Sequence, residues 1–284
     1  SPIIFTSFLH GTNCQTAEVI GGLKLPNKEF KLIQKSNNIY ALDLFSSGLD
    51  LNKSTLGGLK NPYPAGHMAE LFYRSKTDNT YKALIHARHP NLPHNDIYSP
   101  WNWVGYEDIV SVNNNESYFD INDTESAKLL MKAFEDNDVP WIHGYFKFDW
   151  RETYVRIIKT SQIKNGTYRV YIDPQTAPQY PPVLGFRFYM LNSFTFLDSP
   201  GEYYINRNNG TLYVFMPSEE TNIKSIDLIL STHDTIISSS LNSKQLKFVS
   251  FQNMMLSVSQ GDGIKLQNVD HVYVNNCTVS NTGG

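Results

Sequence analysis

Val249–Leu256 (VSFQNMML) aligns with Val272–Val279 (VYVNNCTV), and the two segments start 23 residues apart. Apolar residues match at four positions, and Asn253 matches Asn276. A further step of 23 residues towards the N-terminus reaches Ile226, which begins another alternating apolar run. A short period with strand alternation inside each repeat is typical of coiled β architectures, in which each repeat forms one rung.

Stacking of successive rungs about 4.8 Å apart would place equivalent residues on top of one another. Asn253 and Asn276 would lie at the bend between two strands of a rung, because asparagine tolerates the left-handed conformation and can hydrogen-bond its counterpart. An unrelated pair of hairpins is the alternative interpretation, since few repeats are visible. The side chains expected to point inward are Val249, Phe251, Met254 and Leu256, stacked on Val272, Val274, Cys277 and Val279.

The tail from Leu246 to Gly284 resembles the first coils of a known family, the right-handed parallel β-helix carbohydrate-active proteins. This family includes glycoside hydrolases that act on fucosides, xylosides and related polysaccharides. Leu197–Pro217 carries the most specific similarity, with Pro-Gly-Glu-Tyr-Tyr followed by Asn-Gly-Thr-Leu-Tyr. His89 stands where the family usually has an aromatic residue. The other similar segments are Ala17–Gly22, Glu70–Asn91 and Gly144–Trp150.

The middle of the chain loses the 23-residue spacing and contains short strand-like runs separated by Pro, Gly and Asn turns. Such spacing favours an antiparallel sheet or sandwich. We therefore expect an all-β fold, a right-handed parallel β-helix interrupted by an inserted antiparallel, sandwich-like domain with one short helix. The expected divisions are 1–22 for the first β-helix strands, 23–217 for the insert and 218–284 for coils that continue beyond the chain end. The runs are Tyr81–Ala87, Tyr145–Trp150, Tyr154–Ile163, Thr167–Asp173, Phe186–Leu191 and Thr211–Pro217.

Asp123–Asp136 is expected to form the helix. Asp123 and the threonine after it stand where an N-cap belongs, and Pro140 lies beyond the end. The apolar residues recur at helical spacing and predict a helix that packs on a surface rather than one that binds a ligand. These residues are Ala127, Leu130, Met131 and Phe134.

The composition excludes several classes of protein. The 284 residues include only 18% charged residues with a net charge of -3, which disfavours a nucleic-acid partner, and no apolar run is long enough for a membrane span. Cys14 and Cys277 are too few for a disulfide framework. Glycosylation sequons indicate a secreted, extracellular protein, although an Asn-rich cytosolic protein is an open alternative. The sequons begin at Asn52, Asn115, Asn122, Asn165, Asn209 and Asn276, and the Asn-Gly-Thr turns at Asn165 and Asn209 are the ones most expected to be exposed and glycosylated.

The sequence carries no phosphate-binding loop, no nucleophile elbow and no Cys-X-X-Cys pair, so we expect no cofactor and no metal. His86, His89 and His94 form a small cluster. A metal site would need a further firm ligand and supporting hydrogen bonds, so we interpret the cluster as solvated histidines of a proline-rich loop.

Asp262 and Asp270 lie on successive turns of the tail and are weak candidates for the two carboxylates of a glycosidase. Aspartate is also an ordinary turn residue of β-helices. Trp101 and Trp103, in a loop rich in Pro, Asn and Asp, are candidates for an aromatic platform that stacks on sugar rings. Trp150 is expected to be structural, within a strand.

Asp149, which precedes Trp150, is also expected to be structural, and Arg88 and Glu202 are expected to hold the insert together rather than to contact substrate. The resemblance implies a secreted protein that acts on or binds polysaccharides, with its catalytic carboxylates on coils after Gly284. On that basis this chain would be inactive by itself. The alternative is a structural extracellular glycoprotein whose β-helix units assemble into a fibre or matrix. Either continuation of the coils or self-association through the β-helix ends is expected at Gly284, because a bare rung exposes unpaired backbone groups.

Overall fold

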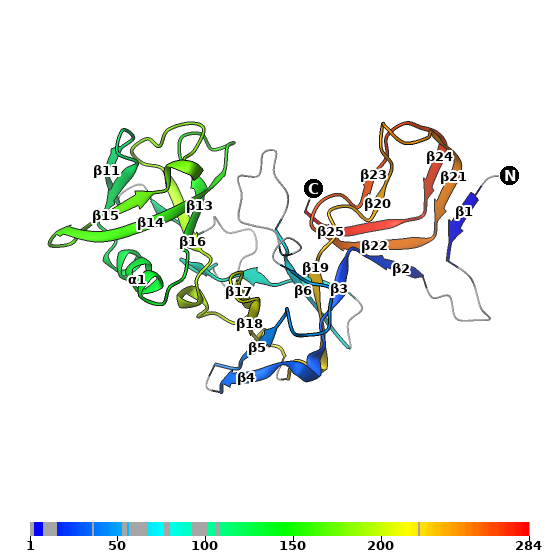
Figure 1. The fold of residues 1–284 in the computed structure, drawn as a ribbon, viewed down its shortest axis with the longest axis horizontal. Helices are drawn as coiled ribbons and strands as arrows, with labels where there is room; N and C mark the ends of the chain where they lie inside the picture. The colour runs from blue at the N-terminus through cyan, green and yellow to red at the C-terminus, as the bar shows by residue number, and fades with distance from the viewer. Residues whose placement is uncertain are drawn as a thin grey trace.

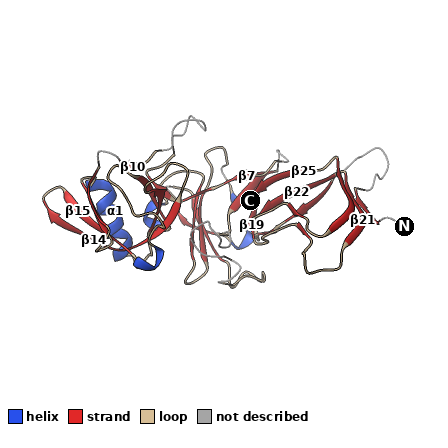
Figure 2. Ribbon diagram, turned by 90° about the horizontal axis from the view of Figure 1, so that it is seen from above, coloured by secondary structure: helices blue, strands red, loops and turns tan. Residues whose placement is uncertain are grey.

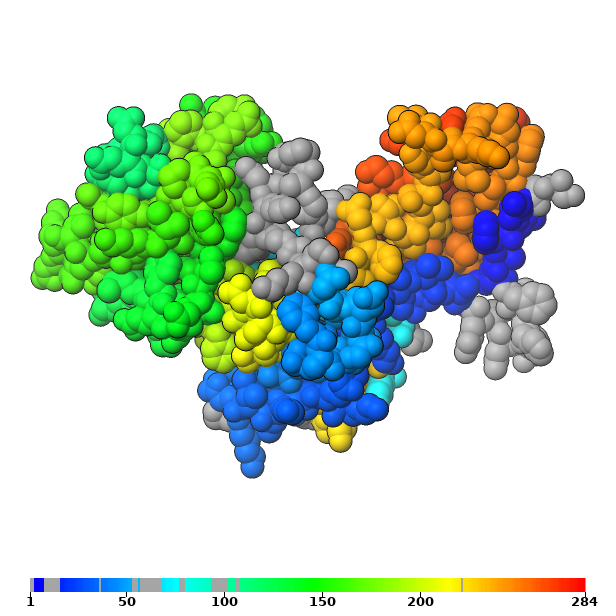
Figure 3. All heavy atoms as spheres, viewed as in Figure 1, coloured from blue at the N-terminus to red at the C-terminus, as the bar shows by residue number. Residues whose placement is uncertain are grey.

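The computed structural model describes residues 3–7, 16–35, 37–52, 56, 68–76, 80–92, 102–105, 108–220 and 222–283. Their regular secondary structure is mainly β-strand, with one α-helix in the described part, α1 (Thr124–Glu135). The molecule is elongated, with α1 and its sheet at one end and the C-terminal strands at the other (Figures 1 and 2). The N-terminal strand lies at the outer edge of the C-terminal group, as Figure 3 also shows in blue beside orange. The described part contains no helix long and apolar enough to cross a membrane.

The C-terminal strands pair in parallel with one another and with the N-terminal residues. Val249 is the register partner of Val272, and Met255 is the partner of Thr278, so the expected 23-residue spacing is confirmed in the pairing. Ile3 pairs with Val249 on the other side. The sheet orders are β1 (Ile3–Thr6), β21 (Leu246–Gln252), β24 (Val269–Asn275); β2 (Ala17–Ile20), β22 (Met254–Ser259), β25 (Thr278–Thr282); and β20 (Ile237–Ser238), β23 (Ile264–Lys265).

Left-handed residues recur at the same spacing. Asn253 and Asn276 have φ angles of 55° and 49°, and the Asn276 side-chain amide donates a hydrogen bond of 2.8 Å to Asn253 Oδ1. Asn253 in turn donates to Thr6 Oγ1 at 3.1 Å. The expected ladder of bend residues is therefore confirmed, and it extends to Thr6. The other left-handed pairs are Phe248 with His271 and Val258 with Asn281.

The parallel strands enclose a small apolar core. Phe251 is 8% exposed, and the Phe5 ring stacks on it with centroids 5.3 Å apart. Val274 and Val279, which were also expected to point inward, are about half exposed on the outermost strands β24 and β25. The buried residues of this core are Val249, Phe251, Met254 and Leu256, with Val272 and Cys277 partly buried against them.

The expectation that Ile226 begins a rung in the same stack is wrong. Ile226 opens β19 (Ile226–Ser231), which lies between two antiparallel neighbours, and β1 takes the place next to β21. Apolar alternation specifies a half-buried strand but not its partner, so the pattern of β19 suited either sheet. The order of this sheet is β3 (Gly22–Lys24), β19, β6 (Leu71–Ser75), β7 (Lys82–Ala83).

Two larger sheets complete the β structure. The five-stranded sheet is antiparallel except where β17 pairs with β8, and the eight-stranded sheet is antiparallel throughout. The first has the order β4 (Lys31–Gln34), β5 (Ile39–Asp43), β18 (Thr211–Phe215), β17 (Glu202–Asn206), β8 (Ile85–His86). The second has the order β10 (Val104–Gly105), β16 (Arg187–Leu191), β13 (Trp141–Tyr145), β14 (Thr153–Lys164), β15 (Thr167–Ile172), β12 (Tyr118–Ile121), β11 (Ile109–Asn113), with β9 (Arg88–His89) also paired to β16.

The predicted helix is confirmed as α1. Asp123 is its N-cap, and the Asp123 carboxylate accepts a 3.1 Å hydrogen bond from the Ser126 N–H. Ala127 and Leu130 are fully buried in the core of the eight-stranded sheet, and Met131 and Phe134 pack against that core. The apolar stripe therefore serves packing, as expected.

Most of the predicted strand runs of the middle region are observed, but Tyr81–Ala87 is divided between β7 and β8 in different sheets, and Tyr145–Trp150 is not a single strand. Strand β13 ends at Tyr145, and the chain then bends. The Arg151 N–H donates to the Phe148 carbonyl at 3.1 Å, which closes a turn around Trp150. The expectation that Trp150 lies within a strand is therefore wrong.

Short 3-10 helices connect several strands. They are η1 (Asn27–Glu29), η2 (Pro174–Thr176), η3 (Phe194–Phe196) and η4 (Ile223–Ser225).

Candidate functional site

Asp262 and Asp270 each form an ion pair of their own. Asp262 contacts Lys265 Nζ at 3.0 Å. Asp270 contacts His271 Nδ1 at 2.5 Å and Lys247 Nζ at 3.5 Å, and the hydrogen bond with His271 holds the pKa of Asp270 below its usual range. A general acid of a glycosidase needs a raised pKa, so this environment does not prepare Asp270 to donate a proton.

Of the two tryptophans predicted as a platform, Trp101 lies outside the described residues, and Trp103 is half-buried. The Trp103 ring packs against Tyr145 and Tyr189, with centroids 5.7 and 5.4 Å away. The guanidinium groups of Arg88 and Arg187 lie 6.0 and 5.6 Å from its ring centroid. Trp103 is therefore one member of an aromatic and arginine cluster.

Trp150 is the most exposed large apolar side chain of the described residues, at 70%. Its ring stacks nearly parallel on Phe148, with centroids 5.3 Å apart and planes at 13°. Tyr180 closes the edge of the stack, 5.1 Å from Phe148 and 6.1 Å from Trp150. We call Phe148, Trp150 and Tyr180 the aromatic platform. Trp150 is thus exposed rather than part of the core, and sequence analysis did not identify this group of side chains.

The local fold explains why the platform faces outward. Phe146 is 2% exposed and anchors the end of β13, and its carbonyl accepts a 2.9 Å hydrogen bond from the Val183 N–H. The turn at Phe148–Arg151 then directs the Trp150 side chain away from the core. Its immediate neighbours Asp149 and Arg151 are charged, and this pattern of an aromatic residue between charges was the available sequence signal for exposure.

Polar groups surround the platform. Asp149 is 78% exposed and binds Arg187 Nη1 at 2.7 Å. The Arg187 guanidinium also lies 4.9 Å from the centroid of Tyr145, so it links the platform to the cluster around Trp103. The Arg151 guanidinium donates to Gln179 Oε1 at 3.1 Å. Carboxylate, guanidinium and amide groups beside an exposed indole can hydrogen-bond hydroxyl groups while the ring covers an apolar face.

Glu152 lies just after the platform and approaches a buried histidine. His143 is 4% exposed, and its Nε2 is 3.4 Å from Glu152 Oε2. The His143 ring stacks on Tyr154 at 4.2 Å. Hydrogen bonding to His143 lowers the pKa of Glu152, so Glu152 is disposed to act as a carboxylate acceptor.

Arg88 and Glu202 join separate segments of the structure through hydrogen bonds, which agrees with the role expected for them. Glu202 is 2% exposed and accepts hydrogen bonds from the N–H groups of Asp198 and Ser199 at 3.1 Å and of Arg88 at 3.3 Å. The Arg88 guanidinium lies 3.6 Å from the centroid of Tyr189 and donates to the carbonyls of Pro90 and Asn102.

The interpretation of the histidine cluster as solvated is wrong for His86. Both of its ring nitrogens are buried, its ring lies 5.3 Å from Tyr203, and burial lowers its pKa to about 3. His94 lies outside the described residues. No group of three or more His, Cys, Asp or Glu side chains in the described part is arranged to hold a metal ion.

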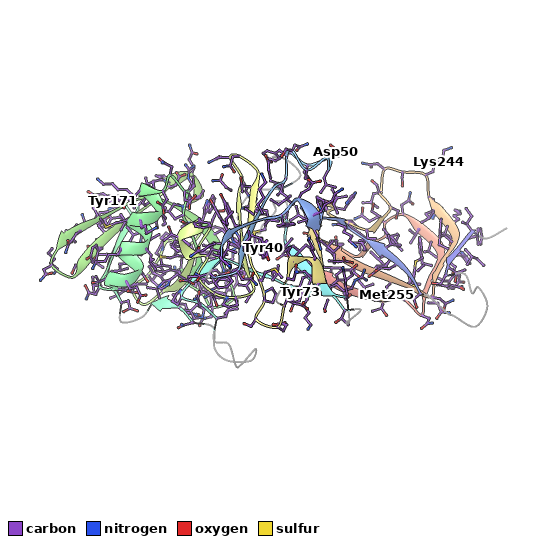
Figure 4. The ribbon with its side chains drawn as sticks, turned by 90° about the horizontal axis from the view of Figure 1, so that it is seen from below. Tyr40, Asp50, Tyr73, Tyr171, Lys244 and Met255 are labelled. Atoms are coloured by element: carbon purple, nitrogen blue, oxygen red, sulfur yellow. The ribbon has the colours of Figure 1, made fainter. Side chains whose placement is uncertain are left out.

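A depression of about 480 Å³ lies between the ends of the segment Leu197–Pro217. Pro200, Gly201 and Pro217 line it together with Tyr73, which Figure 4 labels in the middle of the molecule. The Tyr73 hydroxyl donates a 2.5 Å hydrogen bond to Glu219, and this bond lowers the pKa of Glu219. The depression therefore presents a carboxylate acceptor but no prepared proton donor.

No family model matches the chain, and no curated protein matches it. The fold is similar to a solved structure described as a glycoside hydrolase, with a TM-score of 0.57 and 14% sequence identity over 87% of this chain. The chain spans 37% of the length of that protein. At this identity the similarity shows that the two proteins share a fold.

Proposed function

We propose that this protein is a carbohydrate-binding protein of glycoside hydrolase-like fold, and that the aromatic platform is a glycan-binding site. The observation that carries the proposal is the exposed, nearly parallel stack of Trp150 on Phe148. An indole held flat by a second ring is a rigid surface that loses little conformational freedom when a sugar ring stacks on it. Asp149 and Arg187 lie where they can hydrogen-bond the hydroxyl groups at the rim.

We further propose that β1, β2 and the strands from β20 to β25 form the first coils of a right-handed parallel β-helix, and that the segment between β2 and β20, which includes β19, is inserted into it. The parallel pairing of β1 and β2 with strands near the C-terminus supports this arrangement, as does the recurrence of left-handed residues every 23 positions. Secretion is part of the proposal and is supported by exposed sequons.

The test is binding of soluble polysaccharides to the full chain by affinity electrophoresis and calorimetry, using a panel of neutral and acidic polymers. Trp150→Ala should weaken binding at least tenfold, which corresponds to about 1.4 kcal/mol. Tyr273→Ala is the matched control, because Tyr273 is a 60% exposed aromatic residue on β24. Equal affinity of the wild type and Trp150→Ala for every bound polymer would refute the assignment of the site.

A second candidate function is assembly of a structural glycoprotein through the outermost parallel strands. The observation that favours it is the exposure of apolar side chains there, with Ile3, Ile4 and Phe5 of β1 at least half exposed. Sedimentation velocity over a range of concentrations tests it. Association that Ile4→Lys abolishes would support assembly, and a concentration-independent monomer would contradict it.

A further inference from the structure

Four lysines gather around one shallow depression of about 600 Å³ in the middle of the molecule. Leu25 and Pro26 form an apolar part of its lining, and Asp227 is the carboxylate among the lining residues. The lysines come from β3, η1, the residue after β6, and η4, so the depression is a product of the fold rather than of one charged run. They are Lys24, Lys28, Lys76 and Lys224.

Hydrogen bonds fix the segments that carry these lysines. The side-chain amide of Asn27 donates to the carbonyls of Ile223 and Ile226, which joins η1 to η4 and to the start of β19. The Lys76 N–H donates to the Ser225 carbonyl at 3.1 Å. The flexible lysine stems therefore extend from anchored backbone positions.

The charges in the depression are not balanced. Asp227 is engaged by Lys24 Nζ at 2.8 Å and by the Arg74 guanidinium at 3.8 Å. Within the described part of the chain, Lys28, Lys76 and Lys224 have no carboxylate within ion-pair distance. Such a concentration of positive charge is notable in a protein whose net charge is -3, and it raises the local concentration of anions.

The geometry points to a binding site for an anionic polysaccharide that carries sulfate or carboxylate groups. The shallow shape and the spacing of the ammonium groups over several segments suit a chain with repeated charges. Lysine contributes a mobile point charge, whereas a single deeply bound anion usually requires an arginine fork or converging backbone N–H groups. Pro26, which is half-buried, provides an apolar contact for a sugar ring between the charges. This inference rests on the proposed carbohydrate binding and specifies the class of ligand.

The experiment measures binding of dextran sulfate, polygalacturonate and uncharged dextran to the full chain at low salt. The variant Lys76→Gln with Lys224→Gln should bind one or both acidic polymers at least tenfold more weakly than the wild type. The control, Lys128→Gln with Lys244→Gln, removes the same charge from α1 and from the loop before β21, where Figure 4 labels Lys244. The control should retain affinity within twofold, and both variants should keep the wild-type melting temperature.

The preferred acidic polymer identifies sulfate or carboxylate as the recognised group. Equal losses in the two double variants, no binding of either acidic polymer, or equally tight lysine-dependent binding of duplex DNA would overturn the inference. The two variants distinguish a wrong lysine site from a wrong proposal that the protein binds glycans. If the lysine variant binds normally while Trp150→Ala does not, the lysine site is wrong and glycan binding stands. If acidic polymers bind through the lysines but Trp150→Ala has no effect on any polymer, the platform assignment is wrong.

Discussion

Glu202 shows how a single buried residue can bring distant segments together. Its carboxyl group accepts backbone hydrogen bonds from Ser199, close in sequence, and from Arg88, more than a hundred residues away. Burial nevertheless outweighs these donors and raises the pKa of Glu202 to about 8. The side chain thus connects β9 to the start of β17, and its proton affinity couples this junction to pH.

The stability of the protein should fall between pH 6.5 and 8 because of Glu202. The folded state keeps a proton that the unfolded chain has lost, since an unfolded glutamate titrates near 4.5. The stabilisation is therefore complete below about pH 4.5 and is lost as pH rises through about 8. Urea unfolding should show a decrease on the order of 2 kcal/mol over this window, and at most that much.

Glu202→Gln should be less stable overall, because its NH₂ group would face backbone donors, but it should lack this pH dependence. Glu116→Gln, in an exposed turn, should retain the slope of the wild type. An identical slope in Glu202→Gln and the wild type would show that Glu202 does not hold the proton. The measurement avoids lower pH because His86 contributes there with the opposite sign. Burial lowers the pKa of His86, so its effect is to increase the stability of the fold as pH rises.

Glycan occupancy should differ among the sequons if the protein is secreted. Asn165 and Asn209 lie exposed in turns between paired strands, so we predict that both are glycosylated. Asn276 is exposed too, but its side-chain nitrogen, the atom that would carry the glycan, donates to Asn253. Intact-peptide mass spectrometry should therefore find Asn276 empty. Full occupancy of Asn276 by a glycan would contradict the hydrogen bond between Asn276 and Asn253. Asn52, Asn115 and Asn122, also exposed, remain candidate sites.

At the scale of elements, the parallel strands depend on bends as much as on apolar packing. Asn253 and Asn276 take the left-handed conformation with little strain and bond to each other across neighbouring strands. Phe248 and Val258 adopt the same conformation without that advantage. Phe248 and Val258 keep this conformation because the strands that carry them are hydrogen-bonded to a parallel strand on each side, which fixes the backbone.

Removing the Phe251 ring should destabilise the parallel strands strongly. The side chain is buried between Phe5 and the inner residues of the parallel strands, so Phe251→Ala should cost on the order of 3–5 kcal/mol. Tyr273→Ala, at a 60% exposed position of β24, should cost less than about 1 kcal/mol. Denaturant unfolding measures both. A loss below about 1 kcal/mol for Phe251→Ala would mean that the enclosed core contributes little.

Local signals in the sequence predicted the helix and many of the strands well, but they predicted less well which strands pair with one another. The N-cap at Asp123 and the 23-residue spacing of Val249 and Val272 are properties of neighbouring residues, and the structure contains both features. Ile226 was placed in the wrong sheet because β3 and β6, its actual neighbours, are contributed by remote segments. Trp150 was misplaced because hydrophobic content alone did not reveal where β13 ends.

At the scale of the whole molecule, remote pairing creates the candidate sites. The buried residues form one large core around α1 and the eight-stranded sheet, another between the four- and five-stranded sheets, and smaller cores near the parallel strands. The lysine depression lies where β3, β6 and β19 meet, whereas the aromatic platform lies beyond the end of β13. The lysine depression could not be predicted from the sequence, because strand order determines which remote side chains become neighbours. For the platform, the charged neighbours of Trp150 were a local signal of exposure.

The most direct test of the account is hydroxyl-radical footprinting of the full chain with and without a saturating bound polysaccharide. Trp150 is 70% exposed and should be oxidised readily in the free protein. We predict that the polysaccharide lowers oxidation of the Trp150 peptide at least fivefold, while Tyr273, on the distant strand β24, is oxidised as before and corrects for radical scavenging. Unchanged oxidation of Trp150 in the saturated complex would contradict the claim that the aromatic platform binds glycans.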